Sequence, residues 1–487
     1  MASIEELRRM RIEKLESLKK AGVNPYPART SRTHNIREVI EGFDKFENAK
    51  TNLVLAGRII GRREHGSLLF LDLQGGDSKL QLHCQEEKLG KEKFKQLQEF
   101  IDIGDFIEAH GSALTTKRGE KSLDVSDYKV LVKTIRPVPT TWYGLKDFEE
   151  RMRRRYLDLL LNPETKELFR KKNIFWQTVR NFLTKEGFLE VETPVFEDIP
   201  GGADAEPFST RYNALNRDFY LRISLELPLK KLIVGGYEKV FEIGRIFRNE
   251  GIDAEHLQEY TQMEFYWSYA DYNNAMELTE KLYKELAQKI LGRGESEYDG
   301  KKIQWGEKWP RIDYFDVFKK ETSLDLNKAS KEDLLKKAQS LKIEADKELG
   351  WGRLADLIFK KTVRPKMIQP CFIIHHPVEV SPLSKRRSEN PKQVERFQIM
   401  AGGSEIGNGF SELNDPIDQR IRFEEQMKLR EAGDKEAQIL DEAFIEALEY
   451  GMPPTAGFGM SERVFSVLMD KSIRETTIFP YFKEKND

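Results

Sequence analysis

FEIGRIFRNEGIDAEHLQEYTQMEFYW, residues 241–267, joins two alternating runs through a charged turn. Alternate positions in each run share one face of an extended chain, so the stretch predicts a β-hairpin. Arg248 and Glu250 would lie at its turn and Glu264 on its second strand. A guanidinium can bind a carboxylate or a phosphate through two parallel hydrogen bonds, while acids can hold amines. From the periodicity alone, a charged hairpin with solvent-facing ion pairs is the more common interpretation.

The length and composition limit the class of protein. A chain of 487 residues is too long for one ordinary core and predicts two or three domains. The formal net charge of −2 gives no sign of a polyanion partner, so any nucleic-acid affinity must come from local patches. Cys84 and Cys371 lie far apart without metal-ligand spacing, which favours a reducing setting. No apolar run reaches the roughly eighteen residues of a membrane span, and a cytoplasmic protein without a membrane segment is expected.

Five short alternating runs between residues 52 and 139 predict strands, because Gly and Asp turns separate them. A helical patch lies near residues 91–100. This pattern is typical of a small Greek-key barrel of the OB type. We place the barrel at residues 46–140, after an N-terminal helical extension of residues 1–45.

One face of such a barrel binds single-stranded nucleic acid by stacking bases on aromatic rings, while cationic side chains follow the phosphates. Arg62, Arg63, Phe70 and Gln81 lie where that face would be. An isolated phenylalanine is more often a core residue. The prediction of RNA binding therefore depends on the barrel and not on Phe70 alone.

Residues 141–487 hold the remaining informative stretches. An amphipathic helix over residues 165–187 precedes FLEVETPVF, whose Pro194 favours an edge or interface strand. In the loop GGADAEPF, Gly202 allows the backbone to approach a ligand, although a flexible loop is the more common explanation. A strand and a helix that carries Glu226 then lead into the hairpin.

Glu405, Asn408 and Glu412 recur at short intervals in ERFQIMAGGSEIGNGFSELNDP, residues 395–416. The glycines favour a strand over a helix, and on a strand Glu405 shares a face with both partners only if a bulge intervenes. Carboxylates so arranged suit Mg²⁺, which takes one or two protein carboxylates and completes its shell with phosphates and water. Glu405 and Glu412 are therefore the predicted metal ligands.

A glycine-rich strand leads into a helix at GFGMSER, residues 457–463, with Arg463 at the junction. Backbone N–H groups and an arginine at a helix start are suited to phosphate binding. A match of the form GxGxxxR is weak by itself, so the prediction depends on the other stretches.

Together these stretches resemble the class II aminoacyl-tRNA synthetases over about residues 1–487. The three motifs of that class have candidates in the right order at residues 188–194, 241–267 and 457–463. GGA, RNEGI, MEFY and GNGFSELNDP are more specific and resemble lysyl-tRNA synthetase of the class II type. The resemblance implies an α+β fold, in which an OB-type anticodon-binding barrel precedes a catalytic domain built on an antiparallel sheet flanked by helices.

The resemblance also implies a role for individual residues. Arg248 would contact the amino-acid carboxylate and the α-phosphate, and with Arg463 it forms the expected catalytic pair. The expected ATP-binding set is Arg248, Glu250, His256, Tyr260, Glu405 and Arg463. The expected lysine-binding set is Gly202, Glu226, Arg248, Glu264, Tyr266, Asn408 and Glu412. The expected anticodon-binding set is Arg63, Phe70 and Gln81.

The function implied by the resemblance is ATP-dependent activation of L-lysine to lysyl-adenylate and its transfer to the 3′ end of tRNA(Lys). The enzyme would be a homodimer with Mg²⁺ as cofactor. Two alternatives stay open, namely a catalytically weakened paralogue that acts as an RNA-binding or regulatory protein, and an aspartyl or asparaginyl synthetase. An aspartate pocket would need buried cations in place of Glu264 and Glu412, which argues against the second.

Three departures from the family pattern bear on the alternative of a catalytically weakened paralogue. Gln398 stands where the family usually supplies a further metal-binding glutamate. The hairpin loop reads EHLQEY where the family more often has HNPEF, and GFGMSER is about one residue shorter than the usual run before the arginine.

Overall fold

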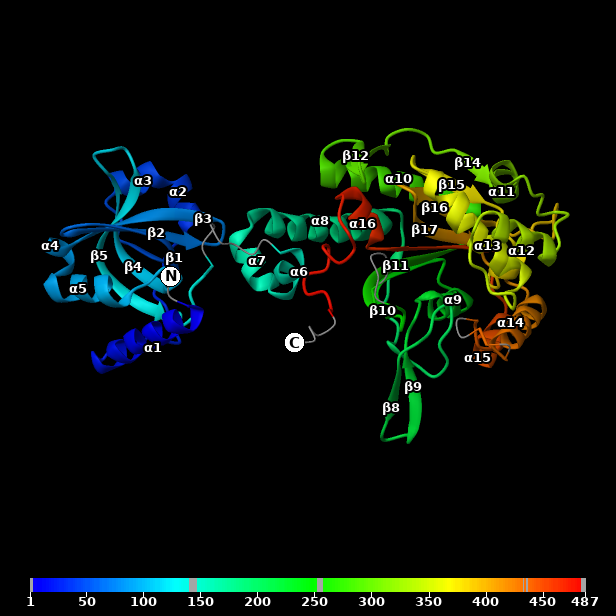
Figure 1. Cartoon of the computed structure of the whole chain (residues 1–487), viewed down its shortest axis with the longest axis horizontal. Coiled ribbons are helices and arrows are strands. Elements are labelled where there is room, and N and C mark those ends of the chain that lie inside the picture. The colour runs from blue at the N-terminus through cyan, green and yellow to red at the C-terminus, as the bar shows by residue number, and fades with distance from the viewer. Residues whose placement is uncertain (1–2, 140–146, 252–256, 432, 435–436, 483–487) are drawn as a thin grey trace. The chain divides into compact units, whose positions relative to one another are not determined.

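The computed structural model describes residues 3–139, 147–251, 257–431, 433–434 and 437–482. The chain forms two compact units, Met1–Pro163 and Glu164–Asp487 (Figure 1). Each unit has its own hydrophobic core. The predicted domain boundary between residues 140 and 141 stays a prediction, because residues 140–146 lie outside the described part.

A closed five-stranded barrel lies at the centre of the N-terminal unit, as the alternating runs predicted. Its strands are β1 (Leu53–His65), β2 (Leu68–Gly75), β3 (Ser78–Gln85), β4 (Phe106–Thr115) and β5 (Lys121–Val132). They pair in the order β1-β2-β3-β5-β4, and only the β3–β5 pair of the barrel is parallel. Along β2, Leu69, Leu71 and Leu73 are buried while Phe70 and Asp72 are partly exposed. The period of two thus separates a packed interior from an outer face.

In the described part of this unit, seven helices precede, interrupt or follow the barrel strands along the chain. They are α1 (Ile4–Lys20), α2 (Ile36–Glu41), α3 (Phe43–Asn48), α4 (Glu86–Leu89), α5 (Lys91–Phe100), α6 (Phe148–Arg153) and α7 (Arg155–Leu161). Ser3 and Glu6 form a capping box at the start of α1, which satisfies N–H groups that the first turn leaves free. Lys14 of α1 forms a salt bridge of 2.6 Å with Asp102. At least one basic side chain of this helix is therefore paired within its own unit.

One large sheet organises the second unit. Its strands run in the order β14-β15-β16-β17-β18-β11-β10-β6. Their bounds are β6 (Leu189–Glu190), β10 (Lys239–Phe247), β11 (Glu259–Ser268), β14 (Arg311–Asp313), β15 (Cys371–Ile374), β16 (Arg396–Ala401), β17 (Ser404–Ser411) and β18 (Thr455–Ser461). The inner neighbours are antiparallel, but the β10–β6 and β14–β15 pairs at the two edges are parallel. The sheet is therefore antiparallel through its centre, as predicted, with one parallel pair at each edge.

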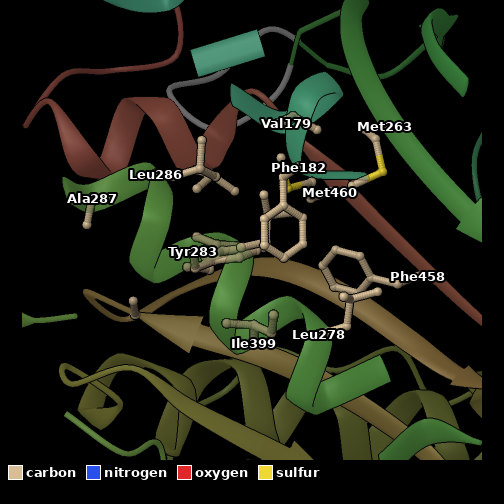
Figure 2. Packing of buried hydrophobic residues seen from close by; sticks show 14 of the residues in the cluster. Val179, Phe182, Met263, Leu278, Tyr283, Leu286, Ala287, Ile399, Phe458 and Met460 are labelled. Carbon is tan, nitrogen blue, oxygen red and sulfur yellow. The ribbon is translucent and has the colours of Figure 1, made fainter. Parts of the chain in front are cut away.

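Two long helices, α8 (Pro163–Lys185) and α10 (Tyr272–Leu291), pack on the same hydrophobic core of this sheet together with α16 (Arg463–Leu468). Figure 2 shows Phe182 of α8 and Tyr283 of α10 against Met263, Phe458 and Met460 of the central strands. The Tyr283 hydroxyl donates a hydrogen bond of 2.5 Å to the Ile406 carbonyl, so this polar group is satisfied inside the core. On the opposite face of the same strands, Val240, Tyr266 and Phe410 belong to a second hydrophobic cluster.

The remaining elements of the second unit form smaller layers. Strands β7 (Phe196–Glu197), β8 (Ser209–Tyr212) and β9 (Arg217–Leu221) make a separate sheet, and β12 (Glu295–Tyr298) pairs with β13 (Lys301–Gln304). The other helices are α9 (Glu226–Val234), α11 (Tyr314–Thr322), α12 (Lys331–Ser340), α13 (Trp351–Thr362), α14 (Pro416–Glu431), α15 (Glu442–Glu449), and the 3₁₀ helices η1 (Arg364–Lys366) and η2 (Val378–Val380). Among the described residues, no helix is both long enough and apolar enough to span a bilayer.

Candidate active site

Strands β10 and β11 pair along their whole length and form the predicted hairpin. On β11, Met263 and Phe265 point into the helical core, while Glu264 and Tyr266 line a cavity on the opposite face. Glu242 of β10 and Glu264 are only 4% and 3% exposed. The alternative of a hairpin with solvent-facing ion pairs is therefore wrong, because its central acids are buried.

Two cavities lie on this face of the sheet and share part of their lining. Their volumes are about 280 Å³ and about 50 Å³. The residues that line both are Arg248, Gln262, Asn408 and Gly459. The larger cavity also contains the predicted ATP-binding residues Glu250, Tyr260, Glu405 and Arg463. The smaller cavity also contains the predicted lysine-binding residues Gly202, Glu226, Glu264 and Tyr266.

Four neutral donors hold the Glu264 carboxylate. Its Oε1 accepts hydrogen bonds from the Ser224 hydroxyl at 2.8 Å, the Leu225 N–H at 3.0 Å and the Gln262 amide at 2.6 Å. Its Oε2 accepts one from the Tyr266 hydroxyl at 2.9 Å. These donors satisfy a buried acid and fix its orientation, and none of them carries a positive charge. Sequence reasoning missed Ser224 and Gln262, although Gln262 shares the face of Glu264 by the period of two.

Glu226 and Glu412 face a lysine of the protein itself. Lys230 lies one turn after Glu226 on α9 and is completely buried. Its Nζ lies 2.5 Å from Glu226 Oε1 and contacts Glu412 Oε2. Burial opposes the charge of Lys230, but the two carboxylates raise its pKa above the ordinary value. The three side chains therefore form an ionic bridge from α9 to the end of β17.

The structure does not place Glu412 on the lining of either cavity. Its carboxylate lies behind Gly457, where an added Cβ would come within 2.1 Å of Glu412 Oε1. Burial raises the pKa of Glu412 well above that of an ordinary glutamate. Sequence reasoning placed Glu412 directly on the substrate and missed Lys230, although the i, i+4 spacing from Glu226 was visible.

Arg248 connects the two cavities at the turn of the hairpin. Its backbone N–H donates to the Gln258 carbonyl at 2.9 Å, and its guanidinium lies 5.7 Å from the centre of the Tyr260 ring. Burial opposes its charge, but Tyr260, Glu250 and Glu264 raise its pKa above the ordinary value. The guanidinium is thus a permanent cation at the boundary of both cavities. His256 lies outside the described residues, so its predicted ATP contact stays a prediction.

Arg463 begins α16 directly after β18, as the glycine-rich motif predicted. Its Nη2 donates to the Ser404 hydroxyl at 3.0 Å, and its side chain lines the larger cavity. Arg364, which had no sequence signal, lines the same cavity. Together with Arg248, these guanidinium groups suit a ligand with several phosphates.

A bulge in β17 brings Glu405 and Asn408 to the same cavity. The register of β16 and β17 pairs Ile399 with Gly407 but Met400 with Glu405, so Ile406 is an extra residue. Both Glu405 and Asn408 line the larger cavity, although they are three positions apart on the strand. The bulge that the predicted metal site required is therefore present.

The carboxylate set limits how Mg²⁺ can be held. Glu405 reaches the larger cavity, but Glu412 contacts Lys230, so the structure does not bring the two predicted metal ligands together. Within the described residues, no group of three or more His, Cys, Asp or Glu is arranged to hold a metal. One carboxylate beside a cavity lined by guanidinium groups still fits Mg²⁺ that arrives with a nucleotide, because such ions keep mostly phosphate and water ligands.

Gln398, the departure from the family pattern, has a buried partner. His376 Nε2 lies 3.0 Å from Gln398 Oε1, and the two side chains are 2% and 7% exposed. With this orientation of the amide, Nε2 carries the proton and donates the bond. Burial lowers the pKa of His376 to about 3, so the ring stays neutral at physiological pH. The Gln398 carbonyl oxygen is engaged and is a poor candidate for a metal ligand.

The predicted nucleic-acid face lies on the outer side of the barrel. Arg63 and Phe70 are cross-strand partners on β1 and β2, and Arg63 also contacts Asp72 at 3.3 Å. Gln81 is the partner of Asp72 on β3. Arg62 instead donates to the carbonyls of Gln98 and Ile101, both at 2.7 Å, and serves the packing of the unit. The three anticodon candidates are thus brought together and Arg62 is not.

A histidine adds to this face. The rings of Phe70 and His83 have centroids 5.4 Å apart, and His83 Nδ1 lies 3.2 Å from Asp124 Oδ1 on β5. Sequence reasoning did not single out His83. Its place two residues after Gln81 on an alternating strand was the available signal.

Comparison with known proteins agrees with both units. The family described as tRNA synthetases class II (D, K and N) matches residues 147–483, and an OB-fold nucleic acid binding domain matches residues 53–131. The chain therefore belongs to the class II tRNA synthetases of the D, K and N group.

Within this group, the chain is similar over its length to curated lysine–tRNA ligases. The lysine–tRNA ligase of Roseiflexus castenholzii is 44% identical over 486 residues, which covers 99% of each chain. That of Pelotomaculum thermopropionicum is 44% identical over 487 residues, or 99% of this chain and 96% of the relative. That of Carboxydothermus hydrogenoformans is 42% identical over 488 residues and 99% of each.

Proposed function

We propose that this protein is an enzyme that activates L-lysine with ATP and transfers it to the 3′ end of tRNA(Lys). One observation carries the proposal, namely that a narrow cavity lined by buried acids shares Arg248 with a wider cavity lined by guanidinium groups. An amino acid and a nucleotide bound there would meet at one cation. The full-length similarity to lysine–tRNA ligases supports the same activity.

The reaction needs positioning more than a nucleophilic side chain. The carboxylate of lysine attacks the α-phosphorus of ATP in line, and pyrophosphate leaves. Arg248 would hold the carboxylate and the α-phosphate, while Arg463 and Arg364 would receive the outgoing phosphates. Fixed cations in a preformed cavity offset the charge that develops without reorganising at the moment of reaction. Tyr260, whose pKa burial raises to about 12, would stay a neutral ring beside the adenine.

The proposed cofactor is Mg²⁺, for which Glu405 and the phosphates of ATP would be the ligands. The ion would supply further positive charge to the phosphates. Glu250 lines the same cavity and would accept a hydrogen bond from the adenine amino group.

Selectivity for lysine would come from acids that a neutral side chain leaves unpaired. Glu226 and Glu264 line the smaller cavity and would hold the two ammonium groups of the substrate. Asn408, Tyr266 and Gly202 complete the lysine site. A ligand without the terminal ammonium would leave a buried carboxylate without its partner, which strongly disfavours binding. An aspartate pocket would need cations at these positions.

The proposed partner of the barrel is the anticodon of tRNA(Lys). Its outer face presents Phe70 for stacking and Arg63 for a phosphate, with Gln81 beside them. We also place the enzyme in the cytoplasm, which agrees with the free thiols of Cys84 and Cys371.

A homodimer is proposed because the second unit exposes apolar side chains in its first motif and directly after it. Leu189, Val195 and Phe196 are 48%, 37% and 60% exposed. Contiguous exposed apolar residues are typical of an interface. Light scattering of the purified chain should give twice the monomer mass, and a monomer mass would refute this part of the proposal.

Pyrophosphate exchange with each amino acid tests the activity. We expect exchange with L-lysine and Mg·ATP and none with aspartate or asparagine. Charging of tRNA(Lys) follows in a second assay. A protein that shows no exchange with any amino acid would instead be the weakened paralogue.

A further inference from the structure

A buried ammonium of the protein already occupies one site between acids of the lysine-binding region. Lys230 Nζ contacts Glu226 Oε1 at 2.5 Å and Glu412 Oε2, and the exposed fraction of Lys230 is 0%. The rings of Tyr266, Phe410 and Phe444 surround this nitrogen at 6.0, 5.4 and 5.7 Å from their centroids. Acids and aromatic rings arranged in this way form a binding site for an alkyl ammonium, and here the ammonium belongs to Lys230 of the protein itself.

Two neighbouring arginines make their direct contacts elsewhere, and Arg396 acts on Glu226 through its charge alone. Arg222 pairs with Glu242 at 2.7 Å. Arg396 donates to Asn408 Oδ1 at 2.8 Å and to the Val380 carbonyl at 2.7 Å, which are neutral groups. In direct contacts among the described residues, Glu226 and Glu412 therefore share the single ammonium of Lys230.

The sharing leaves one negative charge for a ligand. In their ionised forms, which burial opposes and the contact with Lys230 favours, the two carboxylates beside one ammonium carry a formal charge of −1. Of these three side chains only Glu226 lines the smaller cavity, so this charge is presented to a ligand through Glu226. Glu264, which accepts hydrogen bonds from neutral donors only, presents a second negative charge. L-Lysine brings two ammonium groups, and the lining offers one acid for each.

We propose that Lys230 is a positioning residue for the substrate, which acts through Glu226 and sets the charge that the cavity presents to L-lysine. Glu412 draws Lys230 partly away from Glu226, so that Glu226 keeps the capacity to bind a substrate ammonium. Without Glu412, Lys230 pairs with Glu226 alone and competes with the substrate. Without Lys230, two buried carboxylates face each other and one of them takes up a proton. The inference depends on the proposed lysine activation.

The test is a double-mutant cycle read by lysine-dependent pyrophosphate exchange. Lys230→Met and Glu412→Gln are each expected to raise the KM for lysine at least tenfold, with the KM for ATP changed less than twofold. The double variant Lys230→Met/Glu412→Gln removes one charge of each sign and is expected to recover most of the loss. A neutral pair in place of a buried ion pair is also tolerated structurally.

The adjacent Lys231 gives a matched control. It is on the same helix, is 39% exposed at its side chain and lies 3.7 Å from Asp441. Lys231→Met should leave both KM values unchanged. The pH profile adds a second readout, because Lys230→Met should bind lysine better as the pH rises from 7 to 9 and its acid pair loses the added proton.

Three outcomes would overturn the inference. One is an unchanged KM for lysine in Lys230→Met. Another is a KM for lysine in the double variant that is no lower than in Glu412→Gln alone, which would mean that Lys230 contributes only to packing. This comparison also tests the inference if Lys230→Met does not fold. The third is an equal rise of both KM values. Absence of exchange in the unmodified enzyme would refute the proposed function instead, so the two failures are distinguishable.

Discussion

Tyr266 and Glu264 lie two residues apart on the same face of β11, and the tyrosine hydroxyl donates a hydrogen bond of 2.9 Å to Glu264 Oε2. The bond orients one oxygen of an acid that is 3% exposed. The phenol stays protonated because burial raises its pKa well above the ordinary value. Tyr266 therefore fixes the orientation of the Glu264 carboxylate.

Tyr266→Phe should weaken lysine binding while leaving ATP binding intact. Loss of one hydrogen bond to a charged group corresponds to about 1.5–3 kcal/mol, or roughly a ten- to hundredfold rise in the KM for lysine. Steady-state pyrophosphate exchange measures both KM values. Tyr237→Phe, at an exposed tyrosine, is the control. An unchanged KM for lysine would remove Tyr266 from the amine site.

Gly457→Ala should disturb the lysine site through its packing. The added Cβ would lie 2.1 Å from Glu412 Oε1 and 2.6 Å from Tyr266 Cε1, so both side chains must move. Overpacking of this kind costs about 1–3 kcal/mol of stability, and we expect the KM for lysine to rise about tenfold. Gly306→Ala is the matched control, because nothing lies within 4 Å of its added Cβ. Equal behaviour of the two variants would contradict the close approach.

Glu405→Gln should weaken the binding of the metal with the nucleotide. Mn²⁺ in place of Mg²⁺ can be followed by electron paramagnetic resonance with a non-hydrolysable ATP analogue. Loss of a single carboxylate ligand should lower the affinity about tenfold, the scale of disturbed metal shells. Glu424→Gln, at an exposed glutamate of α14, should behave as the unmodified enzyme does. Full Mn²⁺ affinity in Glu405→Gln would place the metal elsewhere.

His376 should make the second unit sensitive to acid. Its folded pKa of about 3 lies below the ordinary histidine value of about 6.5, so between these values the unfolded chain binds a proton that the folded chain does not. Stability is therefore complete above pH 6.5 and falls with falling pH, by about 3 kcal/mol at pH 4. The free energy of unfolding, measured with urea at pH 7 and pH 4, should fall less in His376→Gln than in the unmodified protein, by about this amount. Equal losses of unfolding free energy in the unmodified protein and in His376→Gln would contradict this role of His376.

Phe70→Ala should separate tRNA charging from lysine activation. Phe70 belongs to the barrel, whereas both cavities belong to the second unit. Loss of a stacking platform costs about 1–3 kcal/mol per base, which predicts a tenfold or greater fall in kcat/KM for tRNA with unchanged pyrophosphate exchange. Ile40→Ala, at an exposed residue of α2, controls for surface truncation. Normal charging by Phe70→Ala would remove that ring from the RNA face.

Much of the architecture follows from the period of two. The barrel and the β10–β11 hairpin were predicted because alternate side chains of long strands enter a core or a cavity. The parallel edges of the large sheet were not predicted. β6 and β14 contain two and three residues, which is too short for a periodic pattern to appear.

The candidate site was predicted as a set of residues but not as a set of contacts. Every described member of the expected ATP set lines the larger cavity, because the motif residues come from adjacent strands. Glu412 was placed on the substrate and on the metal, whereas the structure pairs it with Lys230. Such a contact joins α9 to the end of β17 across a long stretch of chain. Single-sequence patterns report neighbours along one element, so this pairing could not be read from them.

The extra residue in β17 has a consequence for how this segment can change during evolution. Ile406 points into the core between Glu405 and Asn408, which both face the cavity. Deleting or inserting one residue here would turn Glu405 toward the hydrophobic core, because each single step reverses the face of a strand. Substitutions have only local effects by comparison. Homologous sequences should therefore keep the number of residues between 404 and 408 constant.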